Sequence, residues 1–163
     1  MNPIEVFQWI LESQKIGSIC ICAGSRNAPL IEMAAGAKGI PLFSFFDERS
    51  AAFFSLGRAK IHPDKWAAVL TTSGTAVAEL LPALIEAHYE GLPLLSLTAD
   101  RPKNFRGTGA PQSIDQFRLL GAYGGEALDI NDSFGHSDFE LLKEKILKPR
   151  ESLHLNFCLG ERG

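Results

Sequence analysis

The sequence predicts an α/β protein with three αβα layers and a mainly parallel sheet of about six strands. Short apolar segments alternate with helical patterns along the whole 163-residue chain. Several of these segments are wholly apolar, as expected for strands that are covered on both faces. Strands that alternate with helices imply right-handed βαβ crossovers, which make neighbouring strands parallel.

Length and composition favour one domain over residues 1–163 and exclude several classes of protein. With 45% hydrophobic and 21% charged residues the chain can bury a real core, and its net charge of -3 gives no electrostatic footprint for nucleic acid. No apolar run is long enough for a membrane span, and no secretory signal is visible. The three cysteines have no partners at metal-ligand spacing, so we expect small buried side chains in a reducing cytoplasm: Cys20, Cys22 and Cys158.

The first helix and strand lead into a polar loop. Asn2 followed by proline predicts a helix over residues 3–16, which Gly17 ends, and an apolar strand follows over 18–22. In the loop after that strand, Ser25 and Arg26 are candidates for binding a carboxylate or phosphate, because arginine presents a planar fork of donors. A capped turn with a surface arginine is the alternative.

The second strand, over about residues 41–46, is apolar and aromatic and is predicted to be buried. It ends in Asp-Glu-Arg, and a helix follows over about 48–60, which Asp47 or Ser50 can cap. Strand ends in open α/β sheets are where ligands bind.

Glu48 lies at this second strand end, next to two aromatic residues, Phe45 and Phe46. Such neighbours would partly desolvate its carboxylate, which makes Glu48 a candidate for proton transfer or for a specific hydrogen bond. The alternative is an ordinary solvated helix start.

The third strand, over 66–71, ends in hydroxyl residues and glycine at 72–75, which open a helix that runs to Tyr89 and stops at Gly91. Helix starts offer unpaired backbone N–H groups to ligands, although hydroxyls here can equally be simple caps. Pro82 should kink this helix.

The fourth strand, over 92–98, ends in Asp100 and Arg101 and is followed by a long polar loop over 103–116. Loops of this length are often functional, so Gln112, with Asp115 or Gln116, is a candidate for lining a pocket or a partner surface. A merely mobile loop is the alternative.

The last third of the chain predicts a strand over 126–130, a helix over 138–147 and a sixth strand over 153–159, in which His154 is expected to be structural. Polar clusters thus follow each of the first four strands. In a parallel sheet these clusters gather along one edge, which is the best argument from the residues for a site.

Five motifs, in this order, resemble the N-terminal domain of the MenD family, the thiamine-diphosphate-dependent synthases of the menaquinone pathway. They span most of the chain and are A-G-S-R-N-A-P-L (23–30), F-D-E-R-S-A-A-F-F-S-L-G (46–57), T-S-G-T-A (72–76), L-T-A-D-R-P (97–102) and G-A-P-Q-S-I-D-Q (109–116). Two loop positions depart from the family pattern, because Ala23 replaces a frequent proline and Asn27 a frequent serine.

The resemblance implies a pyrimidine-binding domain and a specific reaction. An enzyme of this family decarboxylates 2-oxoglutarate on thiamine diphosphate and adds the resulting carbanion to isochorismate, which gives 2-succinyl-5-enolpyruvyl-6-hydroxy-3-cyclohexene-1-carboxylate. Glu48 matches the glutamate that hydrogen-bonds the aminopyrimidine ring and promotes the imino tautomer that deprotonates the thiazolium carbon.

The resemblance also implies roles for other residues at the strand ends. The loop of Thr72, Ser73 and Gly74 matches one near the pyrimidine pocket. Four further residues match positions used around substrate and intermediate, where anionic groups explain the arginines: Ser25, Arg26, Arg101 and Gln112.

One part of the family pattern is absent from the chain. The family holds magnesium and the diphosphate with a Gly-Asp-Gly motif and a downstream asparagine in a further domain, and no such motif occurs here. We therefore expect no metal site in this chain, and expect the chain to be a fragment of a longer enzyme that is inactive alone. The family pairs these domains, so a homo-oligomer is also expected.

Three other functions are alternatives for this sequence. Another thiamine-diphosphate enzyme, such as an acetolactate synthase or 2-oxoacid decarboxylase, would keep the fold but use a different substrate. A non-catalytic interaction domain would explain the incomplete site. A dinucleotide-binding module lacks support, because no G-x-G-x-x-G follows a strand.

Overall fold

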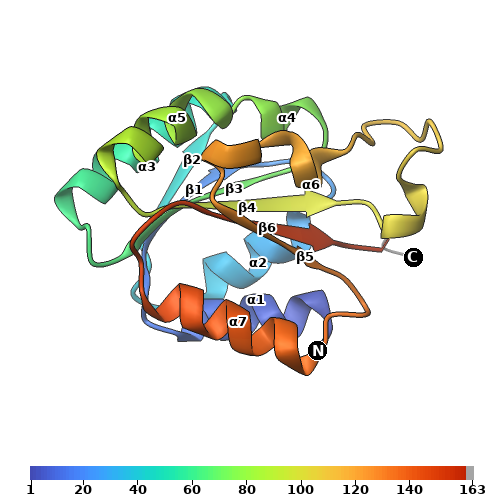
Figure 1. The fold of residues 1–163 in the computed structure, drawn as a ribbon, viewed down its shortest axis with the longest axis horizontal. Helices are drawn as coiled ribbons and strands as arrows, with labels where there is room; N and C mark the ends of the chain where they lie inside the picture. Colours follow the sequence, from blue (N-terminus) through green and yellow to red (C-terminus); the bar gives the residue numbers. More distant parts are fainter. Residues whose placement is uncertain (161–163) are drawn as a thin grey trace.

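The computed structural model describes residues 1–160 and contains one parallel sheet of six strands in the order β2-β1-β3-β4-β6-β5 (Figure 1). The strands are β1 (Ile16–Cys22), β2 (Leu42–Phe45), β3 (Trp66–Thr71), β4 (Leu94–Asp100), β5 (Glu126–Ile130) and β6 (Leu153–Cys158). The helices are α1 (Pro3–Glu12), α2 (Ala28–Gly36), α3 (Glu48–Ile61), α4 (Thr75–Ala78), α5 (Leu81–Glu90), α6 (Gln116–Leu119) and α7 (His136–Leu147), with short 3₁₀ turns η1 (Lys103–Phe105) and η2 (Gly121–Tyr123).

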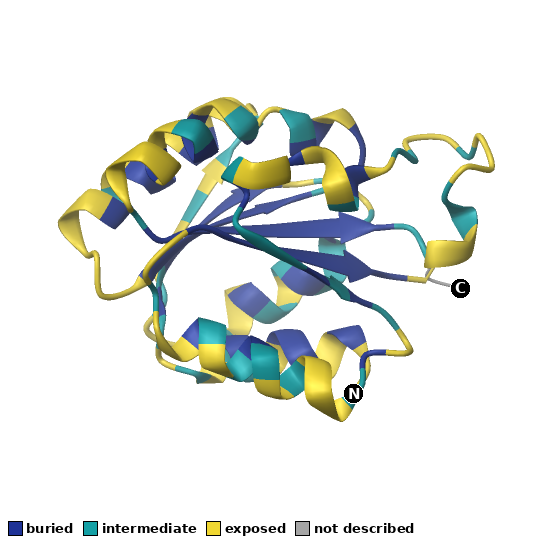
Figure 2. Cartoon of the chain, viewed as in Figure 1, coloured by how far each residue is buried: buried dark blue, intermediate teal, exposed yellow. Residues whose placement is uncertain are grey.

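Two helical layers cover the sheet, which confirms the predicted αβα class. Helices α1, α2 and α7 lie on one face and α3, α4, α5 and α6 on the other (Figure 1). Each layer closes its own apolar core, and strands β3, β4 and β6 are buried along their whole length (Figure 2). No helix within residues 1–160 has the length and hydropathy to cross a bilayer.

The strand order reverses between β1 and β3, which determines where a site can form. The chain leaves β1 through α2 to reach β2 at the edge, and returns through α3, on the opposite face, to β3. The loops that follow β1 and β3 therefore diverge to opposite faces. Open α/β sheets bind ligands outside the carboxyl ends of the strands at such a reversal.

The first helix is shorter than predicted. It ends at Glu12 rather than residue 16, and Gln14 adopts a positive φ of 60° in the turn that follows. Gly17 does not end the helix, because it lies inside β1, where a Cβ atom would approach the Lys65 side chain to 3.0 Å. The Asn2 cap is confirmed, since its side chain accepts from the backbone N–H groups of Ile4 and Glu5.

The prediction that the second strand is buried is wrong. β2 forms the edge of the sheet, its residues alternate between exposed and half-buried, and Phe46 beyond it is fully exposed. The hydrophobicity of an aromatic strand predicts that the strand is buried. Whether it lies in the middle or at the edge of the sheet depends on the strand order, which a local pattern does not contain.

Pro82 divides the helix predicted after the third strand instead of kinking it. Helix α4 ends at Ala78, and α5 begins at Leu81 with Pro82 in its first turn, where its missing N–H costs no hydrogen bond. Gly91 ends α5 in the left-handed conformation, as predicted. The third strand, the fifth strand and the start of α3 also lie where the sequence placed them.

Candidate functional site

The four polar strand ends form a row along the carboxyl end of the sheet, where the parallel strands stop. Strands β2, β1, β3 and β4 are neighbours in that order, and all are parallel. The row therefore begins at Glu48 after β2, continues through the loops that follow β1 and β3, and ends at Arg101 after β4. At about 4.8 Å per strand it is roughly 14 Å long. The predicted convergence is present, as an extended surface rather than a tight cluster.

Glu48 is the first residue of α3, and its carboxylate remains available. Asp47 caps the helix, because its Oδ1 accepts a hydrogen bond from the backbone N–H of Ser50 at 2.7 Å. Glu48 is half-buried and has no hydrogen-bond or ion-pair partner within the part of the chain that the structure describes. The aromatic shielding expected from Phe46 is absent, since that ring is exposed.

The end of β1 lies near this carboxylate. Burial raises the pKa of the Cys22 thiol to about 12, and the negative charge of Glu48 is the second contribution to this rise. Cys22 pairs with Phe45 across the β1–β2 ladder, two residues before the start of the α3 cap. The charge of Glu48 is therefore close enough to the end of β1 to act on the Cys22 thiol.

Asn27 shapes the loop after β1. The motifs identified it only as a departure from the family pattern. Its buried side chain accepts from the Gly24 N–H at 2.8 Å and donates to the Cys22 carbonyl at 2.9 Å. Gly24 packs so closely on the β3 loop that a Cβ atom would lie 2.6 Å from Thr72 Cβ. The β1 and β3 loops are thus in direct contact.

Ser25 and Arg26 differ in their surroundings. Ser25 is exposed, whereas the Arg26 guanidinium donates to the carbonyls of Leu159 and Gly160 at 3.2 and 3.3 Å, just beyond β6. Arg26 therefore reaches across the sheet edge to the end of the last strand.

Two glutamines fasten the β3 loop. Gly74, with a φ of 84°, donates its N–H to Gln116 Oε1 at 3.0 Å, and the Gln112 side chain donates to the Ser73 carbonyl at 2.9 Å. Gln112 itself has a positive φ of 58°, which is uncommon outside glycine. The predicted residues Thr72–Gly74 and Gln112 are therefore brought together.

Beneath these loops, Asn156 organises a buried hydrogen-bond network. Its Nδ2 donates to the carboxylates of Asp100 (3.1 Å) and Asp129 (2.9 Å), which identifies that atom as the nitrogen. Its Oδ1 therefore accepts, from Gln116 Nε2 at 2.8 Å and from the Thr98 hydroxyl at 2.9 Å.

This network also determines the tautomer of His154. The Thr98 hydroxyl has one proton, which it donates to Asn156, so the 2.8 Å contact between Thr98 Oγ1 and His154 Nε2 requires the proton to be on Nε2. His154 Nδ1 is buried and has no partner within residues 1–160. Burial lowers the pKa of His154 to about 4, so the ring is neutral.

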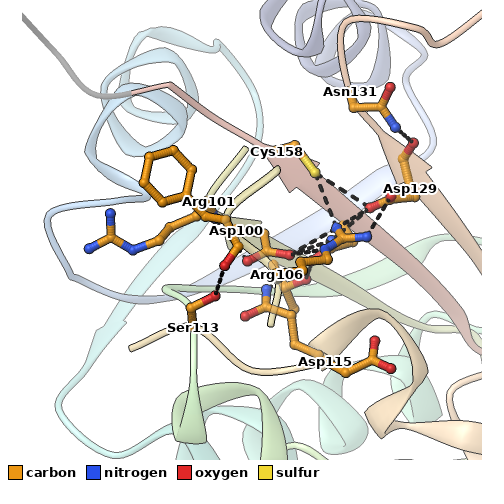
Figure 3. Close-up of polar contacts among 12 residues, drawn as sticks. Asp100, Arg101, Arg106, Ser113, Asp115, Asp129, Asn131 and Cys158 are labelled. Carbon is orange, nitrogen blue, oxygen red and sulfur yellow. Dashed lines mark hydrogen bonds and ion pairs between the residues drawn. The ribbon is translucent and has the colours of Figure 1, made fainter. Parts of the chain in front are cut away.

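Arg106 joins two acidic residues from different strands (Figure 3). Its guanidinium contacts Asp100 Oδ2 at 2.9 Å and both carboxylate oxygens of Asp129 at 2.6 and 2.8 Å. Hydrogen bonds to Asp129 raise the pKa of Arg106, whereas burial of Asp129 is outweighed by bonds from Arg106 and Asn156, which lower the pKa of Asp129. Burial and the Asp129 charge raise the pKa of Cys158 to about 12.

Arg101 lies at the base of the long loop. Its guanidinium packs over the Phe105 ring at 5.6 Å, and its Nε donates to the Pro111 carbonyl at 3.0 Å. The loop therefore folds back over the side chain of Arg101. Across residues 1–160 no group of His, Cys, Asp and Glu side chains has the geometry of a metal site.

Comparison with known proteins is consistent with this arrangement. Residues 1–119 match the family model described as thiamine pyrophosphate enzyme, N-terminal TPP binding domain. The 2-succinyl-5-enolpyruvyl-6-hydroxy-3-cyclohexene-1-carboxylate synthase of Bdellovibrio bacteriovorus is 46% identical over 86% of this chain and 26% of its own length. The synthase of the same name from Akkermansia muciniphila is 43% identical over 98% of this chain and 30% of its own.

These matches confirm the resemblance that the motifs indicated. The chain spans less than a third of the length of the curated relatives just described, at 26% and 30%. Since the family model covers residues 1–119 of the 163, the chain belongs to the family of N-terminal TPP-binding domains of thiamine pyrophosphate enzymes.

Proposed function

We propose that this chain is the pyrimidine-binding domain of a longer, cytoplasmic enzyme that decarboxylates 2-oxoglutarate and joins the remaining four-carbon unit to isochorismate. The observation that carries the proposal is the similarity to two 2-succinyl-5-enolpyruvyl-6-hydroxy-3-cyclohexene-1-carboxylate synthases, at 43–46% identity over most of the chain. The reversal of strand order and the row of polar strand ends support a ligand site at the same edge.

Glu48 is the proposed catalytic residue. Thiamine diphosphate, when bound, supplies the carbon centre that attacks and stabilises the decarboxylated substrate. A half-buried carboxylate at a strand end, with no partner within residues 1–160, fits a hydrogen bond to a ring nitrogen of the aminopyrimidine. The Gly74 turn and its neighbours Thr72 and Ser73, two strands away, are proposed to line the same pocket.

Within residues 1–160 the side chains suit the pyrimidine end of the cofactor and not its diphosphate end. Magnesium and a diphosphate need a set of oxygen ligands, and residues 1–160 offer no suitable acidic cluster. We propose that a further domain of the enzyme holds both. The isolated chain should then neither bind thiamine diphosphate tightly nor turn over.

Ser25, Arg26, Arg101 and Gln112 are proposed to contact the substrates. Both substrates are polyanionic, and arginine pairs well with carboxylates. Arg26 donates to the backbone carbonyls of Leu159 and Gly160, and Arg101 donates to that of Pro111. A substrate carboxylate would be a stronger, charge-assisted acceptor than these neutral carbonyls.

Assembly into a homo-oligomer is proposed through the β2–α3 edge. Large exposed apolar side chains occur there at Leu42, Phe46, Phe53, Phe54 and Ile61. β2 is also an edge strand, with backbone groups free on one side.

The test is a substrate comparison with the whole enzyme that contains this domain. Purified enzyme with thiamine diphosphate and Mg²⁺ is given either 2-oxoglutarate and isochorismate or pyruvate alone. We expect turnover only with the first pair. Turnover of pyruvate, with none of 2-oxoglutarate, would instead support an acetolactate-synthase-like enzyme or another 2-oxoacid decarboxylase.

A further inference from the structure

The loop between β4 and α6 carries two proposed substrate residues, Arg101 and Gln112, and has little regular structure. Within residues 101–115 only the 3₁₀ turn Lys103–Phe105 is regular. Arg101 bonds within the loop itself, to Pro111, and Gln112 reaches the Ser73 carbonyl with a single neutral hydrogen bond. Neither of these two contacts joins the middle of the loop to a strand.

Arg106, in the middle of this loop, connects the loop most strongly to the strands of the sheet. Its guanidinium bonds to Asp100 at the end of β4 and to Asp129 in β5, and the Nη2 atom that contacts both also lies 3.2 Å from Cys158 Sγ in β6 (Figure 3). The three charged side chains are mostly buried, with exposed fractions of 18% for Arg106, 0% for Asp100 and 12% for Asp129. One loop residue is thus bonded to three strands.

The contacts at this position suit the fork of an arginine, since Nη1 and Nη2 hold both oxygens of Asp129 while Nε and Nη2 contact Asp100 Oδ2. Asp100 and Asp129 approach each other closely enough to share both Asn156 Nδ2 and Arg106 Nη2 as donors. A guanidinium can bridge two carboxylates with separate N–H groups, whereas a lysine ammonium is a single point charge. The Phe117 ring, 6.0 Å from the guanidinium carbon, packs over it from the following helix.

We propose that Arg106 is the positioning residue of the substrate loop: by clamping Asp100 and Asp129 it holds Arg101 and Gln112 in place at the strand ends. This inference rests on the proposed function, because it assigns the loop to substrate binding. Arg106 itself is turned toward the sheet and is not proposed to touch a substrate.

The test uses Arg106→Met in the whole enzyme, with Arg118→Met as the matched control. Arg118 lies in the neighbouring helix, and its side chain is 82% exposed. Two quantities are measured: backbone hydrogen exchange over residues 103–113, and KM and kcat for 2-oxoglutarate and isochorismate. For Arg106→Met we expect exchange at least about tenfold faster and KM for one or both substrates raised about tenfold or more, with a smaller change in kcat. The control should match the wild type in both.

A second variant separates positioning from loss of stability. Arg106→Met leaves two buried carboxylates unpaired, so it can destabilise the domain on its own. Without Arg106 the two carboxylates repel each other, and Arg106→Met/Asp129→Asn removes that repulsion. The double variant should therefore recover the unfolding midpoint, while hydrogen exchange in the loop and KM stay altered. Arg106→Lys should recover part of the KM effect at most.

The outcomes distinguish this proposal from the proposed function. If the double variant recovers wild-type exchange and KM along with stability, or if exchange in Arg106→Met is unchanged, Arg106 does not position the loop. Faster exchange with unchanged KM for both substrates also overturns the positioning role. If the wild-type enzyme fails to use this substrate pair, the proposed function fails, while the exchange data still decide whether the clamp holds the loop.

Discussion

Single side chains determine the protonation and the shape of this sheet edge. Asn156 has its nitrogen fixed by two carboxylates, which fixes the Thr98 hydroxyl and, through it, the tautomer of His154. Each step depends on residues from β4, β5 or β6, far apart in sequence. The sequence predicted His154 as structural, and its burial and bond to Thr98 agree with that role.

The buried His154 predicts a loss of stability in mild acid. Its pKa is about 4 in the folded protein and about 6.5 when unfolded, so the unfolded chain binds the proton first as the pH falls. The free energy of unfolding should therefore fall between pH 6.5 and 4, by a contribution of the order of 3 kcal/mol. Urea unfolding of the wild type and His154→Gln checks this, since the variant should lose less stability over that interval. Equal losses would contradict the assignment.

Asn27 gives a second prediction at the scale of the residue. Replacing it with alanine leaves the Gly24 N–H and the Cys22 carbonyl without their partner, and the side chain is fully buried. Asn27→Ala should cost about 1–3 kcal/mol of unfolding free energy. Chemical denaturation measures the loss, with Asn104→Ala, an exposed loop asparagine, as the control. A loss as small as that of the control would show that the loop does not need Asn27.

Individual residues at the carboxyl end of the sheet can be recognised as candidates in the sequence to different degrees. Glu48, Arg26, Arg101 and Gln112 belong to recognisable motifs or strand ends, and a pattern could identify them. Arg106 and Asp129 could not be paired in advance, because 23 residues separate them and only the β4-β6-β5 order brings their segments together.

Elements were predicted best where one local signal decided them. Trp66–Thr71 is wholly apolar and is a central strand, and Asp47 caps α3 as expected. The errors arose where tertiary context decided: β2 is aromatic yet lies at the edge, and Gly17, which was expected to end the first helix, lies inside β1. A hydrophobic pattern reports that a segment packs, and does not report which neighbour covers it.

In the turn between β3 and α4, adding one methyl group at Gly74 should strongly reduce stability. Gly74 has φ 84° and ψ -141°, a region essentially restricted to glycine, and a Cβ atom would lie 2.8 Å from Gln112 Cγ. Gly74→Ala should lose about 1–3 kcal/mol of stability and weaken thiamine diphosphate binding in the whole enzyme. Gly36→Ala is the control, because nothing lies within 4 Å of its Cβ position. Calorimetry measures both, and wild-type cofactor affinity in Gly74→Ala would separate this turn from the cofactor site.

The molecule as a whole is asymmetric in what its surface exposes. The edge formed by β2 and α3 exposes Phe46, Phe53 and Ile61, and a row of polar strand ends begins beside it at Glu48. A site that starts next to an apolar edge fits an enzyme whose pocket is completed by another domain or subunit.

Assembly can be tested through this edge. Phe46→Ser/Phe53→Ser should lower the mass of the assembled enzyme in solution, because it removes exposed apolar area from the proposed interface. Light scattering after gel filtration measures the mass. Leu147→Ser is the control, since Leu147 is 46% exposed at the end of α7 in the opposite helical layer. An unchanged mass for the double variant would remove the β2–α3 edge from the interface.

The central claim is that the carboxylate of Glu48 activates the aminopyrimidine ring, and turnover by Glu48→Gln in the whole enzyme tests it most directly. Glutamine keeps the size and loses the charge, and Asp47→Asn removes the same charge one residue earlier, from the side chain that caps α3. At saturating thiamine diphosphate and Mg²⁺ we predict that kcat for 2-oxoglutarate and isochorismate falls about 100-fold or more in Glu48→Gln and changes little in Asp47→Asn. A Glu48→Gln enzyme with wild-type kcat would contradict the account.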